Sequence, residues 1–368
     1  MNTVSVSLEN RSYDIKIGAD LLPKLHSLVD EVAPATSYFF VLDDGIGSSH
    51  GRTAMQSFDE ESMMCTIEAS ESNKTIDSIQ KIWTEMLAHG CDRQCSLVAI
   101  GGGLIGDVGG FAAATFMRGI SLIQVPTTLL AMVDASIGGK TGINLPLQRG
   151  EESSVLGKNL AGSFWQPRLV VADVTTLLSL NERQFRCGLA ECVKHSMLGH
   201  DALLDYMMQH IEEIFDRAST TMIELVTMNA EIKAGIVAED EREAGKRVLL
   251  NLGHTFAHAI EPLPELSLYH GEAVAIGLCA AVTCAEAMGL ADAEVVDRTR
   301  DMLIKLGLPT RLPVPVGIEE LCNLMRSDKK TIDSQLRLVL PTKDGAMLVE
   351  NVDSSAVGLA WASVGAFA

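Results

Sequence analysis

Three residues that lie far apart in the chain, Glu191, His254 and His270, have side chains that could bind one metal ion. They lie in the segments GLAECVKH, NLGHTFAHAIE and YHGEAV. One carboxylate and two imidazoles form a mixed oxygen and nitrogen donor set, which suits a catalytic zinc ion with a coordination position left for substrate. His258 lies four residues after His254 on the same face of an expected helix, so the spacing alone leaves open which imidazoles bind metal.

A second chemical signal is the glycine-rich segment GGGLIGD, residues 101–107, which directly follows the apolar run SLVAI. Backbone N–H groups at the start of a helix can bind a pyrophosphate, and glycines allow the nucleotide to approach closely. The segment differs from the dinucleotide pattern G-x-G-x-x-G, and in isolation a tight turn needed only for packing is an equally good interpretation. A nucleotide-binding loop and a metal triad on one chain would indicate metal-assisted redox chemistry.

The chain of 368 residues carries a formal net charge of −19. Such a surface repels phosphate backbones and anionic lipids, so we expect neither nucleic acid nor a membrane as a partner. An anionic substrate would therefore need a local basic pocket. Basic residues close to the motifs favour a phosphorylated and carboxylated small molecule as substrate. They are Lys140, Lys158, Lys194, Lys233, Arg247, Lys329 and Lys330.

Several features predict a cytoplasmic protein. The N-terminus lacks a basic segment followed by an apolar one, so no signal peptide is expected. The long, nearly uncharged stretch 108–130 contains Arg118, Pro126 and several glycines, which disfavours a membrane span. The eight cysteines match no familiar metal or redox spacing, and free buried thiols in a reducing compartment explain them.

The apolar pattern changes near residue 175. Before it, short apolar runs alternate with amphipathic segments, which predicts an α/β domain over 1–175 with a Rossmann-like, doubly wound parallel sheet. After it, helical periodicity predicts a mostly α-helical domain over 176–368, apart from a small hairpin around Lys343–Gly345. The expected strands are 38–42, 63–67, 97–100, 122–125 and 169–172, and the expected helices are 76–87, 200–217, 220–240, 271–288 and 295–306.

Long, ordered strings of the chain closely resemble the 3-dehydroquinate synthases of the sugar-phosphate cyclase superfamily. The resemblance extends from about residue 40 to about residue 340. It implies a two-domain enzyme whose first domain binds NAD and whose second domain binds zinc, or cobalt in its place. The strings are GGGLIGDVGGFAAATFMRG, VPTTLLAMVDASIGGKTGIN, GKNLAGSFWQP, GLAECVKH, DEREAGKRVLLNLGHTFAHAIE, HGEAVAIG and DKK.

The resemblance also implies roles for individual residues. The zinc ligands become Glu191, His254 and His270, and a homodimer is implied in which Arg118 reaches the phosphate site of the neighbouring subunit. The implied NAD contacts are Asp43, Glu71, Lys74, Gly103, Leu104, Ile105, Gly106, Asp107, Thr127, Thr128, Lys140, Lys158, Thr176 and Ser179. The implied substrate and catalytic positions are Asp134, Lys140, Asn159, Lys194, Lys233, Glu243, Arg247, Asn251, His258 and Lys330, with His258 beside the phosphate.

The implied reaction converts 3-deoxy-arabino-heptulosonate 7-phosphate into 3-dehydroquinate and inorganic phosphate, in the shikimate route to aromatic amino acids. NAD transiently oxidises the C5 hydroxyl, and phosphate then leaves by β-elimination. NADH returns the hydride, the ring opens and an intramolecular aldol step closes the carbocycle. Zinc would orient vicinal oxygens as a Lewis acid, while lysines and arginine stabilise charge.

The chain departs from the family pattern at three places. The segment QRGEESSV, residues 148–155, is inserted between INLPL and LGKN and is predicted to form a surface loop beside Lys158. His195 stands where a tyrosine is more usual, and Ala257 where a glycine is common. None of these changes removes an implied metal ligand.

Three other functions remain as alternatives. A sibling cyclase would act on sedoheptulose 7-phosphate or glucose 6-phosphate, but those sugars lack the carboxylate that Lys140, Lys233 and Arg247 would bind. A metal- and NAD-dependent polyol dehydrogenase would release NADH and would need no phosphate pocket. A catalytically inactive homologue would serve as a binding module, which the intact set of metal and lysine positions disfavours.

Overall fold

The structure is a computed structural model that describes residues 1–58, 63–149, 153–327 and 336–367. It divides into two compact units, each made of two stretches of chain. The first unit is Met1–Leu180 with Arg217–Arg242, and the second is Asn181–Asp216 with Glu243–Ala368. The chain thus leaves the first unit close to the expected boundary. It later returns to the first unit, where helix α8 (Ser219–Glu239) packs against the first two strands.

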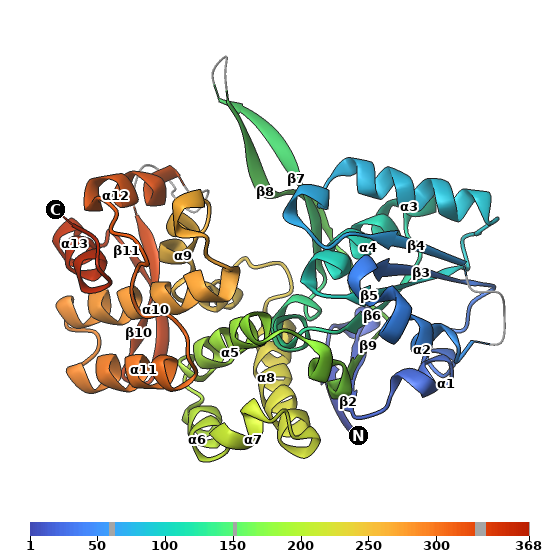
Figure 1. Ribbon diagram of the computed structural model, residues 1–368, viewed down its shortest axis with the longest axis horizontal. Coiled ribbons are helices and arrows are strands. Elements are labelled where there is room, and N and C mark those ends of the chain that lie inside the picture. The colour runs from blue at the N-terminus through green and yellow to red at the C-terminus, as the bar shows by residue number, and fades with distance from the viewer. Residues whose placement is uncertain (59–62, 150–152, 328–335, 368) are drawn as a thin grey trace. The chain divides into compact units, whose positions relative to one another are not determined.

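A seven-stranded sheet in the order β1-β2-β9-β6-β5-β3-β4 forms the centre of the first unit (Figure 1). Strand β1 runs antiparallel to β2, and the other neighbours pair in parallel. The predicted Rossmann-like parallel sheet is confirmed, with an antiparallel edge strand in addition. The strands are β1 (Asn2–Val6), β2 (Tyr13–Gly18), β3 (Tyr38–Asp43), β4 (Met63–Ile67), β5 (Ser96–Gly101), β6 (Ser121–Pro126) and β9 (Leu169–Asp173).

Helices cover both faces of this sheet because its central strands are apolar on both sides. In β3, Phe39 and Val41 pack towards α3 (Ile76–Ala88) and α4 (Gly103–Thr115). Phe40 and Leu42, which point the other way, join a second core with α1 (Leu25–Asp30) and α2 (Arg52–Met55). Figure 1 shows these two helical layers on opposite sides of the sheet. Because successive side chains of a strand point to opposite faces of the sheet, each central strand contributes to both cores.

Strands β7 (Lys140–Arg149) and β8 (Ser153–Phe164) form a separate antiparallel hairpin that extends from the sheet (Figure 1). The prediction of a surface loop over 148–155 was wrong for the part that is described. Backbone pairing continues through Gln148–Ser154 and Arg149–Ser153, because the described residues of the insertion lengthen both strands. Residues 150–152 lie outside the described residues.

The second unit is mostly helical, as predicted, and its centre is α10 (His270–Ala287). This helix is apolar almost all round and contacts α5, α9, α11, α13 and β10. The segment predicted as one helix over 200–217 is two, because the backbone leaves helical geometry at His210 with φ −116°. The remaining elements are α5 (Glu182–Ser196), α6 (Asp201–Gln209), α7 (Ile211–Phe215), α9 (His254–Ile260), α11 (Ala293–Lys305), α12 (Ile318–Ser327), α13 (Ser354–Ser363) and the predicted hairpin β10 (Arg337–Thr342) with β11 (Gly345–Glu350).

All eight cysteines are free, and seven of them are buried, as the sequence predicts. Burial raises the pKa of the Cys279 and Cys284 thiols to about 12. These thiols are therefore core residues without nucleophilic character. Among the described helices, none is both long enough and apolar enough to cross a membrane.

Candidate active site

Apart from Lys140 and Lys158, the residues that the resemblance assigns to NAD in the first unit follow the carboxyl ends of five neighbouring parallel strands. Asp43 ends β3, and helix α4 begins at Gly103 directly after β5. Doubly wound sheets bind ligands along this edge. The other positions are Glu71 and Lys74 after β4, Thr127 and Thr128 after β6, and Thr176 and Ser179 in the 3-10 turn after β9.

The glycines at the start of α4 have two effects. They allow neighbouring segments to pack closely, and they leave the N-terminal end of the helix open. A Cβ atom on Gly106 would lie 2.7 Å from Oε1 of Gln124 on β6. A Cβ on Gly110 would lie 2.4 Å from Cγ2 of Thr141. The packing interpretation of the glycine cluster is therefore sound, and it coexists with a helix N-terminus whose first N–H groups have no intrahelical partner. That combination can bind an anion close to the backbone.

Lys74 connects three segments of this edge. Its side chain is buried, and Nζ donates to Oδ2 of Asp107 at 2.5 Å and to Oδ1 of Asn159 at 2.6 Å. Asp107 is the fifth residue of α4, and Asn159 lies on β8. Two expected NAD residues and one expected substrate residue are thus in direct contact.

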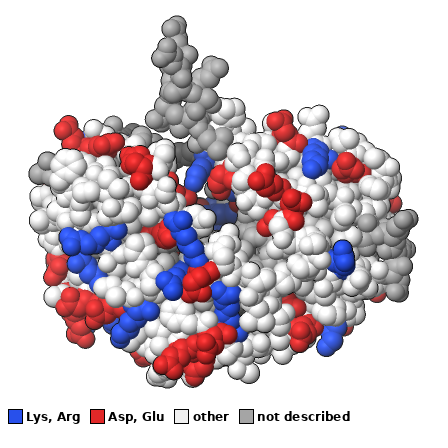
Figure 2. All heavy atoms as spheres, viewed as in Figure 1, with Lys and Arg blue, Asp and Glu red and all other residues white. Residues whose placement is uncertain are grey.

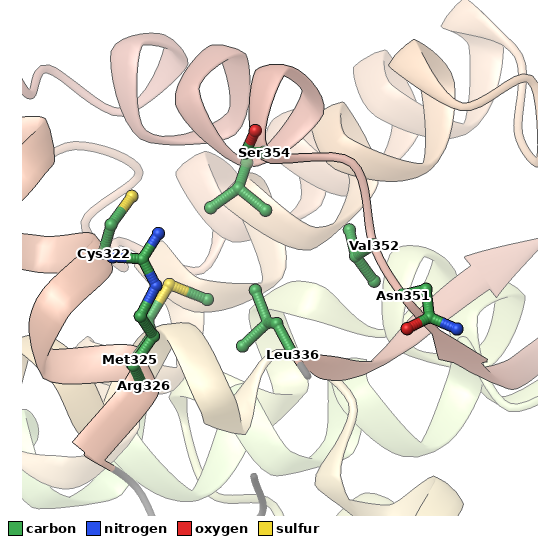
Figure 3. A pocket seen from close by; sticks show the side chains of 8 residues that line it. Cys322, Met325, Arg326, Leu336, Asn351, Val352 and Ser354 are labelled. Carbon is green, nitrogen blue, oxygen red and sulfur yellow. The ribbon is translucent and has the colours of Figure 1, made fainter. Parts of the chain in front are cut away.

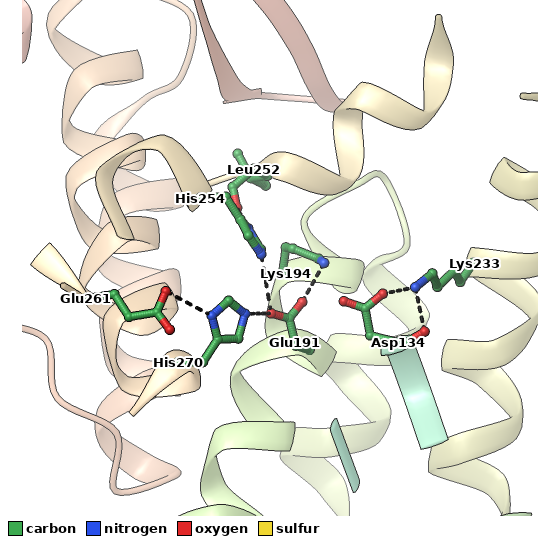
Figure 4. Close-up of polar contacts among 8 residues, drawn as sticks. All are labelled: Asp134, Glu191, Lys194, Lys233, Leu252, His254, Glu261 and His270. Atoms are coloured by element: carbon green, nitrogen blue, oxygen red, sulfur yellow. Dashed lines mark hydrogen bonds and ion pairs between the residues drawn. The ribbon is translucent and has the colours of Figure 1, made fainter. Parts of the chain in front are cut away.

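A second contact in the first unit joins Asp134 and Lys233. Lys233 comes from α8 and is 6% exposed, and Asp134 lies in the turn Ala131–Ala135. The lysine Nζ pairs with Oδ1 of Asp134 and also donates to its backbone oxygen at 2.5 Å (Figure 4). The return of α8 to the first unit brings this pair together.

In the second unit, Glu191, His254 and His270 meet as the sequence predicts. One donor atom from each lies within 4.8 Å of the others. Nε2 of His254 and Nε2 of His270 are each 3.6 Å from Oε1 of Glu191. Figure 4 shows both rings directed at the carboxylate, which also pairs with Lys194. His258 is outside this group, and its ring lies edge-on to His254 with 5.6 Å between the centroids.

Three helices position this triad. Helix α5 carries Glu191 and is capped by Asn181, whose side chain accepts a hydrogen bond from the Gln184 N–H at 2.9 Å. His254 is the first residue of α9, and Gly253 before it has φ +75°, a conformation that favours glycine. His270 is the first residue of α10, where the Glu272 carboxylate accepts from the Tyr269 N–H at 2.8 Å.

The outer ring nitrogens of both histidines have partners that orient the rings. Nδ1 of His254 lies 3.1 Å from the backbone oxygen of Leu252, so this nitrogen donates and Nε2 keeps its lone pair. Nδ1 of His270 lies 3.5 Å from Oε2 of Glu261. Carbonyl and carboxylate partners of this kind are typical of metal-binding histidines.

The pKa values of the two imidazoles shift in opposite directions. Burial lowers the pKa of His254 well below its ordinary value, so this ring is neutral. It also disfavours a charged His270, but hydrogen bonds with Glu191 and Glu261 outweigh burial and raise the pKa of His270 to about 10. Positive charge is therefore favoured between the two carboxylates, where a bound cation would replace the proton.

The triad fits a divalent metal ion. Donors of a tetrahedral zinc site lie about 2.0–2.2 Å from the ion, and hence about 3.4 Å from one another. The two 3.6 Å distances from the histidine nitrogens to Glu191 are close to this value. One carboxylate and two neutral Nε2 donors leave a coordination position open, as a catalytic site requires.

Among the described residues, four lysines and arginines are buried: Lys74, Lys194, Lys233 and Arg247. All four belong to the set that the sequence predicts for NAD or substrate. Exposed basic side chains on the face in Figure 2 lie among acidic ones. Buried cations are rare because desolvation is costly. The three buried lysines each pair with a carboxylate, and all four buried cations lie at positions that the sequence assigns to an anionic ligand.

The other predicted residues lie as follows. Asn251 donates to Oε1 of Glu243 at 2.8 Å in the second unit. Arg118 is exposed, and so are Lys140 and Lys158 on the hairpin β7–β8. Lys330, with the rest of DKK, lies outside the described residues.

Sequence reasoning missed several side chains that contact the predicted set, and Glu261 and Asn144 are two of them. Glu261, beside His270, lies seven residues after His254 and so shares its helix face, a signal that was available. Asn144, which contacts Glu71 and Asn159, ends the string KTGIN, but nothing in its type or spacing indicated those contacts.

A pocket of about 320 Å3 in the second unit lies apart from these residues (Figure 3). It is lined by residues of α12 and α13, by two residues that follow β11, and by Leu336. None of its described lining residues belongs to the predicted site. The lining residues are Cys322, Met325, Arg326, Leu336, Asn351, Val352, Ser354 and Val357.

Known proteins match the chain in both sequence and fold. Family models of the N-terminal and C-terminal parts of 3-dehydroquinate synthase match residues 64–187 and 188–331. The 3-dehydroquinate synthase of Microcystis aeruginosa is 39% identical over 358 residues, which cover 95% of this chain and 94% of that protein. That of Nitrosococcus oceani is 40% identical over 357 residues, with coverage of 96% and 97%.

A solved structure of 2-deoxy-scyllo-inosose synthase, in complex with carbaglucose-6-phosphate, NAD+ and Co2+, has a similar fold. Its TM-score is 0.86 and its identity 26%, and the match covers 97% of this chain and 98% of that one. The two family models together span more than half of the chain, and the sequence relatives match it over nearly its full length. The chain therefore belongs to the 3-dehydroquinate synthase family.

Proposed function

We propose that this protein is a 3-dehydroquinate synthase, a carbon–oxygen lyase that converts 3-deoxy-arabino-heptulosonate 7-phosphate into 3-dehydroquinate and phosphate. Relatives with this name support the activity over nearly the whole chain. The observation that carries it is the burial of Lys74, Lys194, Lys233 and Arg247. Four buried cations suit a substrate that carries both a phosphate and a carboxylate.

The proposed cofactors are NAD, held along the carboxyl edge of the first unit, and zinc or cobalt, held by Glu191, His254 and His270. When bound, NAD accepts a hydride from the substrate and later returns it. When bound, the metal ion acts as a Lewis acid for the substrate oxygens. The related synthase solved with NAD+ and Co2+ supports both assignments.

The protein's own residues bind, orient and stabilise charge. Lys74 and Lys233 in the first unit, and Lys194 and Arg247 in the second, offer positive charge to the phosphate, the carboxylate and the developing oxyanions. Asp134 fixes the Lys233 ammonium group through two contacts. Glu243 fixes the Asn251 amide. Such preorganised groups lower the barrier because they need not reorient during the reaction.

A homodimer in which Arg118 reaches the partner's site is part of this proposal. Met117, Arg118 and Gly119 have φ values of 46°, 71° and 117°. Non-glycine residues held in this region cost about 1–3 kcal/mol each and cluster at functional sites. The strain at two neighbouring residues supports a role for the exposed Arg118 beyond packing. A cytoplasmic location, which the free buried cysteines support, is also proposed.

The direct test is phosphate release from three sugar phosphates at catalytic NAD and stoichiometric zinc. We expect release from 3-deoxy-arabino-heptulosonate 7-phosphate and loss of release with a chelator, restored by added zinc. Release only from sedoheptulose 7-phosphate or glucose 6-phosphate would overturn the proposal in favour of a sibling cyclase. Absence of release from all three by a protein that binds NAD and zinc would also overturn it.

Glu261 is expected to strengthen zinc binding through His270. Replacing it with alanine removes the acceptor for the outer ring nitrogen, so the zinc dissociation constant should rise about 10- to 100-fold. Glu261→Gln retains an acceptor oxygen and should lose less. Competition with a chromophoric chelator measures both. The control is Glu265→Ala, which removes an exposed carboxylate from a neighbouring turn, and an equal loss in the control would contradict the role of Glu261.

A further inference from the structure

The hairpin β7–β8 has an irregularity at Asn144. Ile143 pairs with Ala161, and Leu145 pairs with Gly157. The single residue Asn144 on β7 therefore faces the three residues 158–160 on β8. A bulge of this kind interrupts the hydrogen-bond ladder and redirects side chains, and bulges are frequent beside active sites. Here the bulge contains Lys158 and Asn159, two residues of the proposed ligand site.

The side chain of Asn144 replaces the missing ladder bond. Asn159 has φ +53°, so it lies in the left-handed region, which asparagine tolerates better than most residues. Its N–H donates to Oδ1 of Asn144 at 2.9 Å. Asn144 is 1% exposed, so water does not compete for this contact. The Asn144 carbonyl thus holds the bulge in its conformation.

The amide nitrogen of the same side chain extends to the loop after β4. Nδ2 of Asn144 donates to Oε2 of Glu71 at 2.7 Å and lies 3.3 Å from the Glu71 backbone oxygen. The backbone N–H of Asn144 donates to the backbone oxygen of Lys74 at 2.8 Å. Both donors and one acceptor of the amide are therefore used. Together with the backbone N–H of Asn144, these groups connect Asn159 on β8 with Glu71 and Lys74 on the loop after β4.

This arrangement determines where Lys74 points. With the loop fixed to β7 and Asn159 fixed by its N–H, Nζ of Lys74 reaches both Asn159 and Asp107. Without this support, the Lys74 side chain would not be held between these two oxygens. The segments that Asn144 connects are those to which the proposed function assigns NAD on one side and substrate on the other.

We propose that Asn144 is a positioning residue that holds the NAD-side Lys74 and the substrate-side Asn159 in register with each other. The inference rests on the proposed function for the identity of the two ligands. Asn144 acts through the Asn159 N–H, the Glu71 carboxylate and the Lys74 backbone. It holds the bulge and the loop in the geometry that the ligands require.

The test compares Asn144→Ala and Asn144→Asp with Asn73→Ala in the zinc-loaded protein. Asn144→Ala removes both contacts, and the NAD dissociation constant should rise about tenfold or more, with a fall in kcat of similar size. Asn144→Asp keeps the acceptor for Asn159 but places a second carboxylate against Glu71, so NAD binding should weaken more than substrate binding. Asn73→Ala removes an exposed contact to Glu68 and should change neither value.

The measurements are NAD titration by calorimetry, steady-state kcat and KM, zinc content and melting temperature. Zinc content should stay at the wild-type level in all three variants. Wild-type NAD affinity and kcat in Asn144→Ala, with only a lower melting temperature, would overturn the proposal and leave a purely structural role. If Asn144→Ala does not fold, Asn144→Asp decides by the same criteria. NAD titration needs no turnover, so it tests Asn144 even if the proposed substrate is wrong.

Discussion

Replacing Glu191 with alanine is expected to abolish both zinc binding and turnover. Glu191 is the anionic member of the triad, and it is fully buried between two imidazoles and Lys194. Without it, two histidines remain beside a buried ammonium group, which repels a divalent cation. Loss of a Lewis acid that supplies several kcal/mol should lower kcat/KM by about 10³-fold or more. Zinc per chain after dialysis and phosphate release measure the two effects.

Loss of Glu191 also removes the ion pair of the buried Lys194, so stability must be separated from metal binding. Breaking such a pair costs about 3–5 kcal/mol. The double variant Glu191→Ala with Lys194→Met removes the pair as a whole and should recover part of the melting temperature without recovering zinc. A Glu191→Ala protein that retains one zinc ion per chain and wild-type turnover would refute the ligand assignment.

Replacing Gly271 with alanine is expected to separate the helices that hold the triad. A Cβ atom at this position would lie 2.3 Å from Cα and 2.4 Å from the backbone oxygen of Cys187 on α5. Backbone atoms cannot rotate away, so α10 must shift from α5, which carries Glu191. Gly271 follows His270, and the shift would lengthen the distance between the two ligands. We expect about 1–3 kcal/mol lower stability and at least about tenfold weaker zinc binding.

Gly358→Ala is the matched control because it also adds one methyl group to a helix of the second unit. Among the described residues, no atom outside the local helix backbone lies within 4 Å of the Cβ position at Gly358. Alanine favours a helix by about 0.5–1 kcal/mol over glycine. Unfolding with urea and zinc competition compare the two variants. Equal zinc affinity in Gly271→Ala and Gly358→Ala would contradict the claim that close packing of α10 on α5 sets the ligand distances.

Much of the fold could be predicted from apolar periodicity. The strands β3, β4, β5, β6 and β9 were found because continuous apolar runs follow from burial on both faces. Strands β1 and β2 were missed although Val4 and Val6, and Tyr13, Ile15 and Ile17, alternate inward in the structure. The return of α8 to the first unit had no local signal. It depends on contacts between segments more than 200 residues apart, such as the hydrogen bond between Asn2 and Thr227.

The site could be predicted only where residue type limits the chemistry. A carboxylate with two histidines limits the choice to a few metal ions. The resemblance then implied which histidines bind the metal, His254 and His270 rather than His258. The charge of Lys74 was visible in the sequence, but its burial and its two acceptors were not. Glu261 could have been found from its spacing to His254, whereas Asn144 was missed because its role lies in hydrogen-bond partners that the fold supplies. An amide or a carboxylate has no such partner until distant segments meet.

One reaction with 3-deoxy-arabino-heptulosonate 7-phosphate and limiting NAD, in which released phosphate and accumulated NADH are both measured, distinguishes the proposed lyase from a dehydrogenase. The proposed reaction returns the hydride in every turnover. Phosphate should therefore exceed the NAD supplied many times over, while absorbance from NADH stays near its starting value. NADH that rises in step with product, and stops when NAD is exhausted, would contradict the account and identify a net dehydrogenase.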